Sequence, residues 1–370
     1  MRFVKWTLGC AIALGAGCAA SEQVMAPAVE FRDFGLQAPE VTPVIPLTQL
    51  VVPTYDGSGQ AVHPDVLWFP ARWRGFEYWM AFTPFPGGKE DMENPSIVAS
   101  HDGITWEVPA GLSNPIVPRP PDGAYNSDPD LSYDSAADQL VLLTREVRAG
   151  FNRVSLLTSR DGVTWGQPRK SFLRRNHGMI SPAMVLSASR DPRLWYVDAG
   201  NKNCPRRVTQ VMLQEGDGRR PLANPGLERG WGRALASGLS QPGYHIWHID
   251  VAWVAARREY WAVYPAYPVR RCGPHDLFFA RSSDGVQWTT YPVPLLRHED
   301  QRWTSAMLYR ASALYDADRD VMRLYLSASA PRRDWRLGMV EFRLADLLTR
   351  LSGGIAQPSA AGAAEEHTLP

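Results

Sequence analysis

One short motif recurs three times and constrains the fold more than any other feature of this sequence. It reads Ser-x-Asp-Gly-x-x-Trp and occupies residues 100–106, 159–165 and 282–288. Its Asp residues (Asp102, Asp161 and Asp284) lie 59 and then 123 positions apart, which is close to one period and then two. A fixed period of this kind is typical of repeat architectures. Asp-Gly is a favoured two-residue hairpin turn, because both central positions take φ > 0. We therefore predict structural turns on outer strands, with each Trp packed over its hairpin.

A second pattern runs in phase with the first. Five short strands open in a similar way, at His63-Pro-Asp65-Val, Asp128-Pro-Asp130-Leu, Ser181-Pro-Ala183-Met, His248-Ile-Asp250-Val and Arg310-Ala-Ser312-Ala. The intervals of 65, 53, 67 and 62 residues fit units of four strands, and a strand rich in Tyr, Trp and Leu follows each opening. Five such units arranged radially leave few exposed sheet edges. No segment has a sustained helical period. The sequence thus predicts an all-β chain that forms a five-bladed β-propeller of four-stranded antiparallel blades.

The N-terminus has the features of an export signal. Arg2 and Lys5 supply positive charge, and the apolar stretch 6–17 is too short for a comfortable membrane span. Residues 14–19 resemble a bacterial lipoprotein signal, so Cys18 is the candidate lipidation site, with plain secretion as the alternative. We predict a signal peptide over 1–18, a tether and extension over 19–50, the propeller over 51–351 and a disordered tail over 352–370. The location predicted is the periplasm, the outer membrane or the cell surface, with membrane contact only through a lipid on Cys18, and we expect a monomer.

Export changes the interpretation of the remaining cysteines. Cys204 and Cys272 are the two that lie outside the signal, and each follows a strand-like aromatic run. In an oxidising compartment such a pair is a candidate disulfide. Two unpaired buried thiols are the alternative.

Composition excludes some classes of function. The formal net charge is +1, so no electrostatic feature favours nucleic acid. The chain has no Gly-rich phosphate loop and no Ser nucleophile elbow, which argues against nucleotide and α/β-hydrolase chemistry. The 14 Trp, 13 Tyr and 12 Phe suit pleated surfaces, and aromatic rings also stack on sugars. A carbohydrate is therefore the partner that we expect.

The Asp-Gly turns and the strands opening on Asp resemble those of five-bladed glycoside hydrolases: arabinanases, xylosidases, invertases and levansucrases. The turns also resemble the Asp-boxes of sialidases. The stretch from Tyr78 to Ile97 is similar to a largely uncharacterised bacterial and phage branch of this superfamily. The resemblance covers about residues 60–345.

The resemblance implies an axial pocket where three carboxylates converge from the first three blades. They are an Asp that acts as general base, an Asp that tunes the pKa of the acid and a Glu that acts as general acid. Asp65 matches the base, and Asp130 or its neighbour Asp128 matches the tuning residue. The third opening, Ser181-Pro-Ala183, carries no Glu. Glu93 and Glu146, near the ends of second strands, are the candidates for the acid, and Asp250 is a fifth carboxylate for the pocket.

Glycoside hydrolysis requires one protonated carboxyl group and one ionised carboxylate. Crowding carboxylates in one pocket separates their pKa values, because like charges disfavour joint ionisation. His63, Asn94, Asp128, Arg145 and His248 are the candidates for binding the substrate. His63, His248 and the Asp residues could also form a metal site, but no HxxxH or HExxH spacing supports zinc. We therefore predict no metal and no cofactor, with calcium or another ion on the propeller axis as the alternative.

Three functions follow from these residues. The first is an exported glycoside hydrolase acting on a poly- or oligosaccharide. The second is a non-catalytic surface propeller that binds glycan or protein, which the missing Glu of the third blade supports. This second function predicts pocket carboxylates that are neutralised by Arg or buried in structural bonds. The third is a lyase or phosphorylase, for which Arg145, Arg270 and Arg271 would form the anion-binding cluster.

Overall fold

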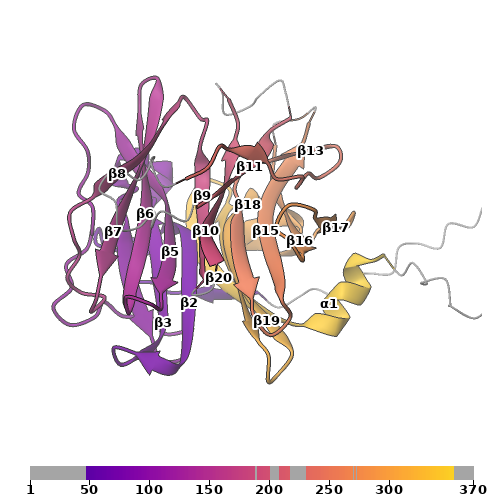
Figure 1. Ribbon diagram of the computed structural model, residues 1–370, viewed down its shortest axis with the longest axis horizontal. Helices are drawn as coiled ribbons and strands as arrows, with labels where there is room; N and C mark the ends of the chain where they lie inside the picture. Colours follow the sequence, from indigo (N-terminus) through magenta and orange to yellow (C-terminus); the bar gives the residue numbers. More distant parts are fainter. Residues whose placement is uncertain are drawn as a thin grey trace, which may run out of the picture. The chain divides into compact units, whose positions relative to one another are not determined.

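A computed structural model describes residues 47–353 except 188–189, 201–207, 217–230, 270 and 272. The chain forms five small antiparallel sheets (Figure 1). Their innermost strands contact one another in the order β2, β5, β9, β14 and β18, and β18 in turn contacts β2. This closed circle of contacts makes the sheets the blades of a five-bladed propeller, which confirms the predicted fold.

The blades follow one another along the chain. Blade one contains β2 (Ala61–Trp73), β3 (Phe76–Pro84) and β4 (Ser96–Ser100). Blade two contains β5 (Tyr125–Asp134), β6 (Gln139–Arg148), β7 (Phe151–Ser159) and β8 (Arg169–Arg175). Blade three contains β9 (Ile180–Ser187), β10 (Arg190–Asp198), β11 (Gln210–Glu215) and β12 (Leu235–Ala236). Blade four contains β13 (Tyr244–Ile246), β14 (Asp250–Val254), β15 (Glu259–Pro268), β16 (Asp276–Ser282) and β17 (Thr289–Thr290). Blade five contains β18 (Met307–Asp316), β19 (Val321–Ala330), β20 (Asp334–Arg343) and β1 (Thr48–Leu50).

The ends of the propeller differ from the sequence prediction. Strand β1 pairs antiparallel with β20, with Gln49 opposite Gly338, so the last residues of the extension predicted over 19–50 complete the fifth blade. Blade one has three strands, and an isolated bridge between Ala99 and Glu107 stands beside β4. The short helix α1 (Leu344–Leu351) was not predicted. Its two turns are too short for a helical period to be evident in the sequence. Within the described ranges, no helix combines the length and the hydrophobicity needed to cross a bilayer.

The hydrophobic core lies between neighbouring blades. Strand β6 shows why its sequence is continuously apolar. Leu140 and Leu142 pack in the cluster shared with blade one, whereas Val141 and Leu143 pack in the cluster shared with blade three. Successive side chains of a strand point to opposite faces, and both faces of this blade are covered.

The Asp-Gly turns also connect blades. The Oδ1 atom of Asp102 accepts hydrogen bonds from the backbone nitrogens of Ile104 and Thr105, both at 2.7 Å. Gly103 takes φ +74°, but Asp102 does not have a positive φ, so the expectation that both central positions take φ > 0 is wrong. The Asp side chain holds the turn instead. The Tyr325 hydroxyl of blade five donates to the Gly103 carbonyl oxygen at 3.0 Å, so this turn of blade one is bonded to blade five, its neighbour in the circle.

Candidate functional site

The openings of the innermost strands direct polar side chains toward the axis. His63 and Asp128 each precede a Pro and take φ values of +56° and +47°. The pairing register shifts at both places, between Val62 and Asp65 and between Ser127 and Asp130. A bulge of this kind redirects a side chain. Positive φ is unfavourable for residues other than Gly, and such conformations cluster at functional sites.

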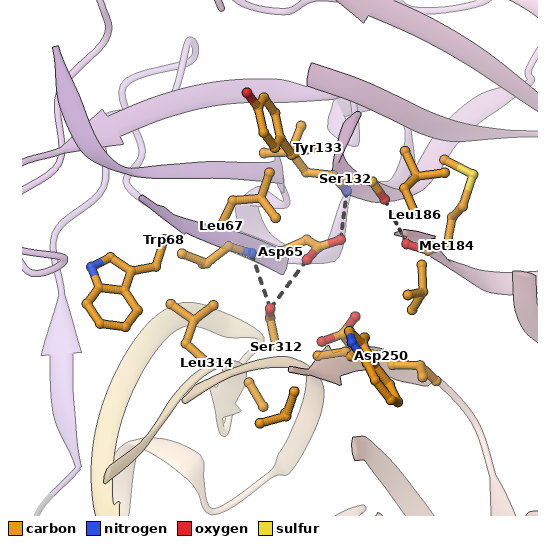
Figure 2. Close-up of a pocket in the computed structure, with 18 of the residues that line it drawn as sticks. Asp65, Leu67, Trp68, Ser132, Tyr133, Met184, Leu186, Asp250, Ser312 and Leu314 are labelled. Atoms are coloured by element: carbon orange, nitrogen blue, oxygen red, sulfur yellow. Dashed lines mark hydrogen bonds between the residues drawn. The ribbon is translucent and has the colours of Figure 1, made fainter. Parts of the chain in front are cut away.

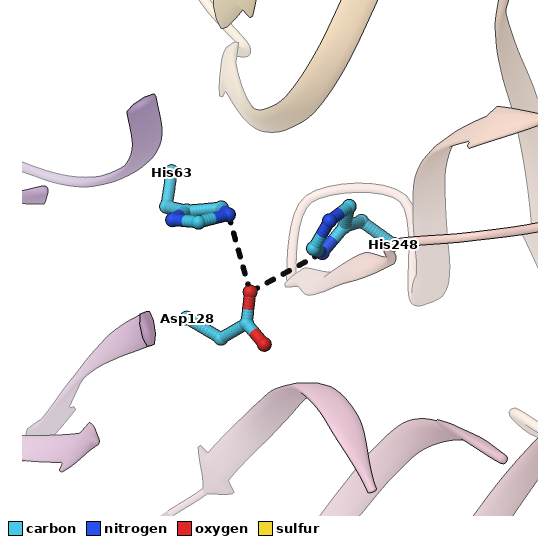
Figure 3. A group of neighbouring side chains, drawn as sticks. All are labelled: His63, Asp128 and His248. Atoms are coloured by element: carbon cyan, nitrogen blue, oxygen red, sulfur yellow. Dashed lines mark ion pairs between the residues drawn. The ribbon is translucent and has the colours of Figure 1, made fainter. Parts of the chain in front are cut away.

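His63, Asp128 and His248 meet in a buried cluster (Figure 3). The Oδ1 atom of Asp128 lies 3.2 Å from Nε2 of His63 and 3.3 Å from Nδ1 of His248. The three facing atoms all lie within 4.8 Å of one another. Blades one, two and four each contribute one of these side chains.

The cluster fits a divalent metal ion. Despite these short distances, none of the three facing atoms makes a hydrogen bond with any residue that the structure describes, although all are buried. Two ligand atoms that each lie about 2.1 Å from one ion are about 3.0–3.4 Å apart at tetrahedral or octahedral angles. Two His and one carboxylate are also a common ligand set for first-row transition metals. A search for HxxxH spacing could not detect this set, because its residues come from three different blades.

Outer contacts fix the orientation of these side chains. Oδ2 of Asp128 accepts hydrogen bonds from Nη1 of Arg145 at 2.8 Å and from the Ser181 backbone nitrogen at 3.2 Å. Nδ1 of His63 lies 3.0 Å from the Thr83 hydroxyl. These bonds occupy the outer atoms and leave Oδ1 of Asp128 and Nε2 of His63 facing the centre. Such supporting bonds set the tautomer and ring orientation of metal-binding His residues.

The protonation states also suit a metal site. Burial lowers the pKa of His63 well below its usual value, and burial lowers that of His248 as well. Burial alone would raise the pKa of Asp128, but the neighbouring His248 and Arg145 hold it well below its usual value. Two neutral imidazoles and one ionised carboxylate are the forms that bind metal.

Glu93 lies beside this cluster and is buried. Its Oε2 atom is 3.5 Å from Nδ1 of His63 and accepts a hydrogen bond from the Ser127 hydroxyl at 2.9 Å. Burial, and then the charge of Asp128, raise the pKa of Glu93 well above its usual value. A buried carboxyl group with a raised pKa is the kind of group that general acid–base catalysis uses.

Asp65, Asp130 and Asp250 form a second buried cluster, and each lies two positions after a member of the first cluster. Figure 2 shows Asp65 and Asp250 at a cavity of about 420 Å³, whose walls include Trp68 and Tyr133. Burial raises the pKa of all three carboxyl groups, that of Asp250 to about 7.

These carboxylates bond to neighbouring blades. Oδ2 of Asp65 accepts a hydrogen bond from the Leu131 nitrogen at 2.8 Å, and Oδ2 of Asp130 accepts one from the Met184 nitrogen at 3.1 Å. The fully buried Arg310 places Nη2 3.6 Å from Asp65 and 3.5 Å from Asp130. Carboxylates paired with Arg and held in structural bonds are the arrangement expected of a non-catalytic pocket.

The structure therefore does not bring the five predicted acid and base residues together. Asp65, Asp130 and Asp250 share one cluster, and Glu93 lies in the other. Glu146 is half-buried and forms ion pairs with Arg148 and, at 3.1 Å, with Arg153. Both His63 and Asp65 face the axis, but at different depths, and an alignment of strand openings cannot separate the two layers.

The predicted substrate-binding residues divide in the same way. His63, Asp128, Arg145 and His248 are brought together. Asn94 instead uses its side chain within the fold, since its Nδ2 donates to the Tyr55 hydroxyl at 2.8 Å and its Oδ1 accepts from Asn126 at 2.9 Å. Arg271 is exposed, and Cys18, Cys204, Arg270 and Cys272 lie outside the described residues.

Sequence reasoning missed three neighbours of the two clusters. Arg310 stands at the opening of the fifth blade, so the alignment of openings already contained a signal for it. The Tyr309 ring packs edge-on against His248, with centroids 4.3 Å apart, and His177 contacts Arg145 at 3.2 Å. Neither Tyr309 nor His177 belongs to a recognisable motif.

Comparison with known proteins supports the fold. The chain is 29% identical, over 319 residues, to an A type blood N-acetyl-α-D-galactosamine deacetylase of Flavonifractor plautii. The match covers 73% of this chain and only 40% of that relative. A crystal structure of an N-acetylgalactosamine deacetylase from F. plautii, in complex with blood group B trisaccharide, superposes with a TM-score of 0.74 and 25% identity. That match covers 85% of this chain and 99% of the other.

More distant structures share the fold alone. A xylan β-1,4-xylosidase from Bacillus halodurans superposes with a TM-score of 0.53 and 15% identity, covering 81% of this chain and 54% of the other. The chain has the propeller fold of five-bladed glycoside hydrolases. No protein-family profile matches it. Both of these solved structures are of carbohydrate-active enzymes, and the one with the higher TM-score is a deacetylase, not a glycosidase.

Proposed function

We propose that this protein is a metal-dependent carbohydrate deacetylase that hydrolyses the acetamido group of an N-acetylated sugar. The observation that carries this proposal is the His63–Asp128–His248 cluster, whose three facing atoms are buried and have no hydrogen-bond partner within the described part of the chain. The similarity to N-acetylgalactosamine deacetylases of F. plautii supports it.

His63, Asp128 and His248 would hold the ion. A divalent cation at such a site acts as a Lewis acid that polarises a carbonyl group and lowers the pKa of water. Arg145 holds Asp128 through its outer oxygen, and Thr83 holds the ring of His63, so the ligand atoms are positioned before any ion binds.

Glu93 is the group that would move the proton. It accepts a proton from water as the water oxygen bonds to the acetyl carbonyl carbon. When the C–N bond breaks, Glu93 returns this proton to the leaving nitrogen, so that the products are acetate and the free amino sugar. The Ser127 hydroxyl bonds to Oε2 of Glu93 and orients the carboxyl group for both transfers.

Glycoside hydrolysis at Asp65, Asp130 and Asp250 is the second candidate. The raised pKa values of these carboxyl groups, beside a cavity, favour it. Their bonds to neighbouring blades and to Arg310 weigh against it.

The cellular setting is also a proposal. The signal predicted over 1–18, with lipidation at Cys18, would place this monomeric enzyme at extracellular or periplasmic glycans. A disulfide between Cys204 and Cys272 would be compatible with that location.

One assay separates the two chemistries. A panel of glycans with and without N-acetylated sugars is incubated with the protein, and both released acetate and new reducing ends are measured. We expect acetate from N-acetylated glycans only, with no new reducing ends. Reducing ends without acetate would replace the proposed function with the glycosidase.

A further inference from the structure

A chain of contacts leads from Asp128 outward to His177. Nη1 of Arg145 donates to Oδ2 of Asp128 at 2.8 Å, and Nη2 of the same side chain lies 3.2 Å from Nδ1 of His177. Asp128 and Arg145 are buried, whereas His177 is half-buried. The chain of contacts therefore ends at a side chain that solvent, or a ligand, can reach.

The partner of His177 determines its tautomer. A guanidinium group has only N–H donors and cannot accept a hydrogen bond. Nδ1 of His177 must therefore be the acceptor, and in the neutral imidazole the hydrogen is then carried by Nε2. Burial, and the nearby charge of Arg145, lower the pKa of His177, which favours this neutral form.

The backbone of His177 is fixed as well. Its nitrogen donates to the Gly200 carbonyl oxygen at 2.9 Å, and its carbonyl oxygen accepts from the Ala199 nitrogen at 3.1 Å. These bonds tie the loop between β8 and β9 to the end of β10. With its Nδ1 edge directed at the buried Arg145, the ring presents one N–H donor on its other side.

We propose that Nε2–H of His177 donates a hydrogen bond to a hydroxyl oxygen of the sugar that binds at the His63–Asp128–His248 cluster. This inference rests on the proposed deacetylase function. A whole guanidinium group separates His177 from Asp128, so His177 contacts a part of the sugar away from the acetyl group. His177 is thus a specificity-determining residue, which recognises the sugar and not the reacting amide.

Two substitutions at this position test the proposal. The Gln of His177→Gln can accept from Arg145 through its oxygen and donate through its nitrogen, so we expect nearly wild-type behaviour. His177→Phe keeps an aromatic ring but removes both the hydrogen-bond acceptor for Arg145 and the donor for the sugar. We expect a KM about 10-fold higher with kcat within about 2-fold, because the contact stabilises ground state and transition state equally. His101→Phe is the matched control, since His101 is exposed in the turn 100–106.

Calorimetric binding of N-acetylated monosaccharides and their singly deoxygenated analogues provides a second readout. The wild type should bind one deoxy analogue about 10-fold more weakly than its parent, whereas His177→Phe should not distinguish that pair. Equal affinities of wild type and His177→Phe for every sugar would overturn the inference. A fall in kcat without a change in KM, not rescued by His177→Gln, would also overturn it. In that case His177 would only position Arg145.

The binding data separate this inference from the proposed function. The wild type could release no acetate and still bind N-acetylated sugars through His177. That result would refute the deacetylase activity and support the hydrogen bond from His177 to the sugar. Acetate release that His177→Phe leaves unchanged in KM and kcat retains the deacetylase and refutes the contact. Failure of the wild type to bind any sugar of the panel refutes the contact directly.

Discussion

Gly162→Ala is expected to be strongly destabilising, because the substitution carries both a backbone cost and a packing cost. Gly162 takes φ +76° in the turn 159–165 of blade two, a conformation that costs an Ala about 1–2 kcal/mol. An added Cβ would also overlap the ring of Trp79 in blade one, and this Trp is only 1% exposed. Overpacking a buried contact costs about 1–3 kcal/mol. The free energy of unfolding should therefore fall by about 2–5 kcal/mol, a large part of the about 5–15 kcal/mol typical of a domain.

Gly150→Ala is the matched control. Gly150 has a similar φ of +82°, but no atom of the described residues lies within 4 Å of its added Cβ. Only the backbone cost of about 1–2 kcal/mol applies there. Urea unfolding followed by Trp fluorescence gives both values, provided that the slope with denaturant is the same for each variant. An equal fall in the free energy of unfolding for the two variants would refute the reasoning that this turn packs blade two against blade one.

Three further predictions concern the axis of the propeller. Glu93→Gln should lower acetate release at least about 100-fold with an unchanged melting temperature, as expected for loss of a general base and acid; residual activity within 10-fold of wild type would exclude that role. Arg310→Met should lower the free energy of unfolding by about 3–5 kcal/mol, because Asp65 and Asp130 lose a buried cation; a neutral effect in urea unfolding would show that these carboxyl groups are already uncharged. The pKa of Asp250 is raised to about 7, so the folded state binds more protons than the unfolded state, and stability should fall as pH rises from about 4 through 7. Asp250→Asn should accordingly lower the difference in melting temperature between pH 5.5 and pH 8, and an unchanged difference in calorimetry would contradict this assignment.

The sequence predicted the fold well because the fold is periodic. Asp102, Asp161 and Asp284 report the repeat length directly, and the five strand openings give the number of blades. Strand β1 and helix α1 were missed, since three residues and two helical turns are too short to carry a period. They are held in place by pairing with β20 and by packing, respectively.

The site was predicted only in part, because its chemistry depends on depth along the axis. The openings bring His63 and Asp65 to the same axis, but two residues apart along one strand. Asp65 joins a layer bonded to Arg310, whereas His63 joins the layer that contains Asp128 and His248. No local spacing distinguishes a carboxylate bonded to the next blade from one that faces a ligand. That distinction depends on contacts between residues more than 50 positions apart, such as Asp65 with Leu131.

The most direct test of the central claim is acetate release from a glycan that ends in N-acetylgalactosamine, measured on chelator-treated protein before and after a divalent ion is added back. Wild type and Asp65→Asn should both be inactive after chelation and should both recover with the ion. Asp128→Asn should stay inactive. Acetate release that resists chelation, or recovery of Asp128→Asn together with loss of Asp65→Asn, would contradict a metal-dependent deacetylase centred on His63, Asp128 and His248.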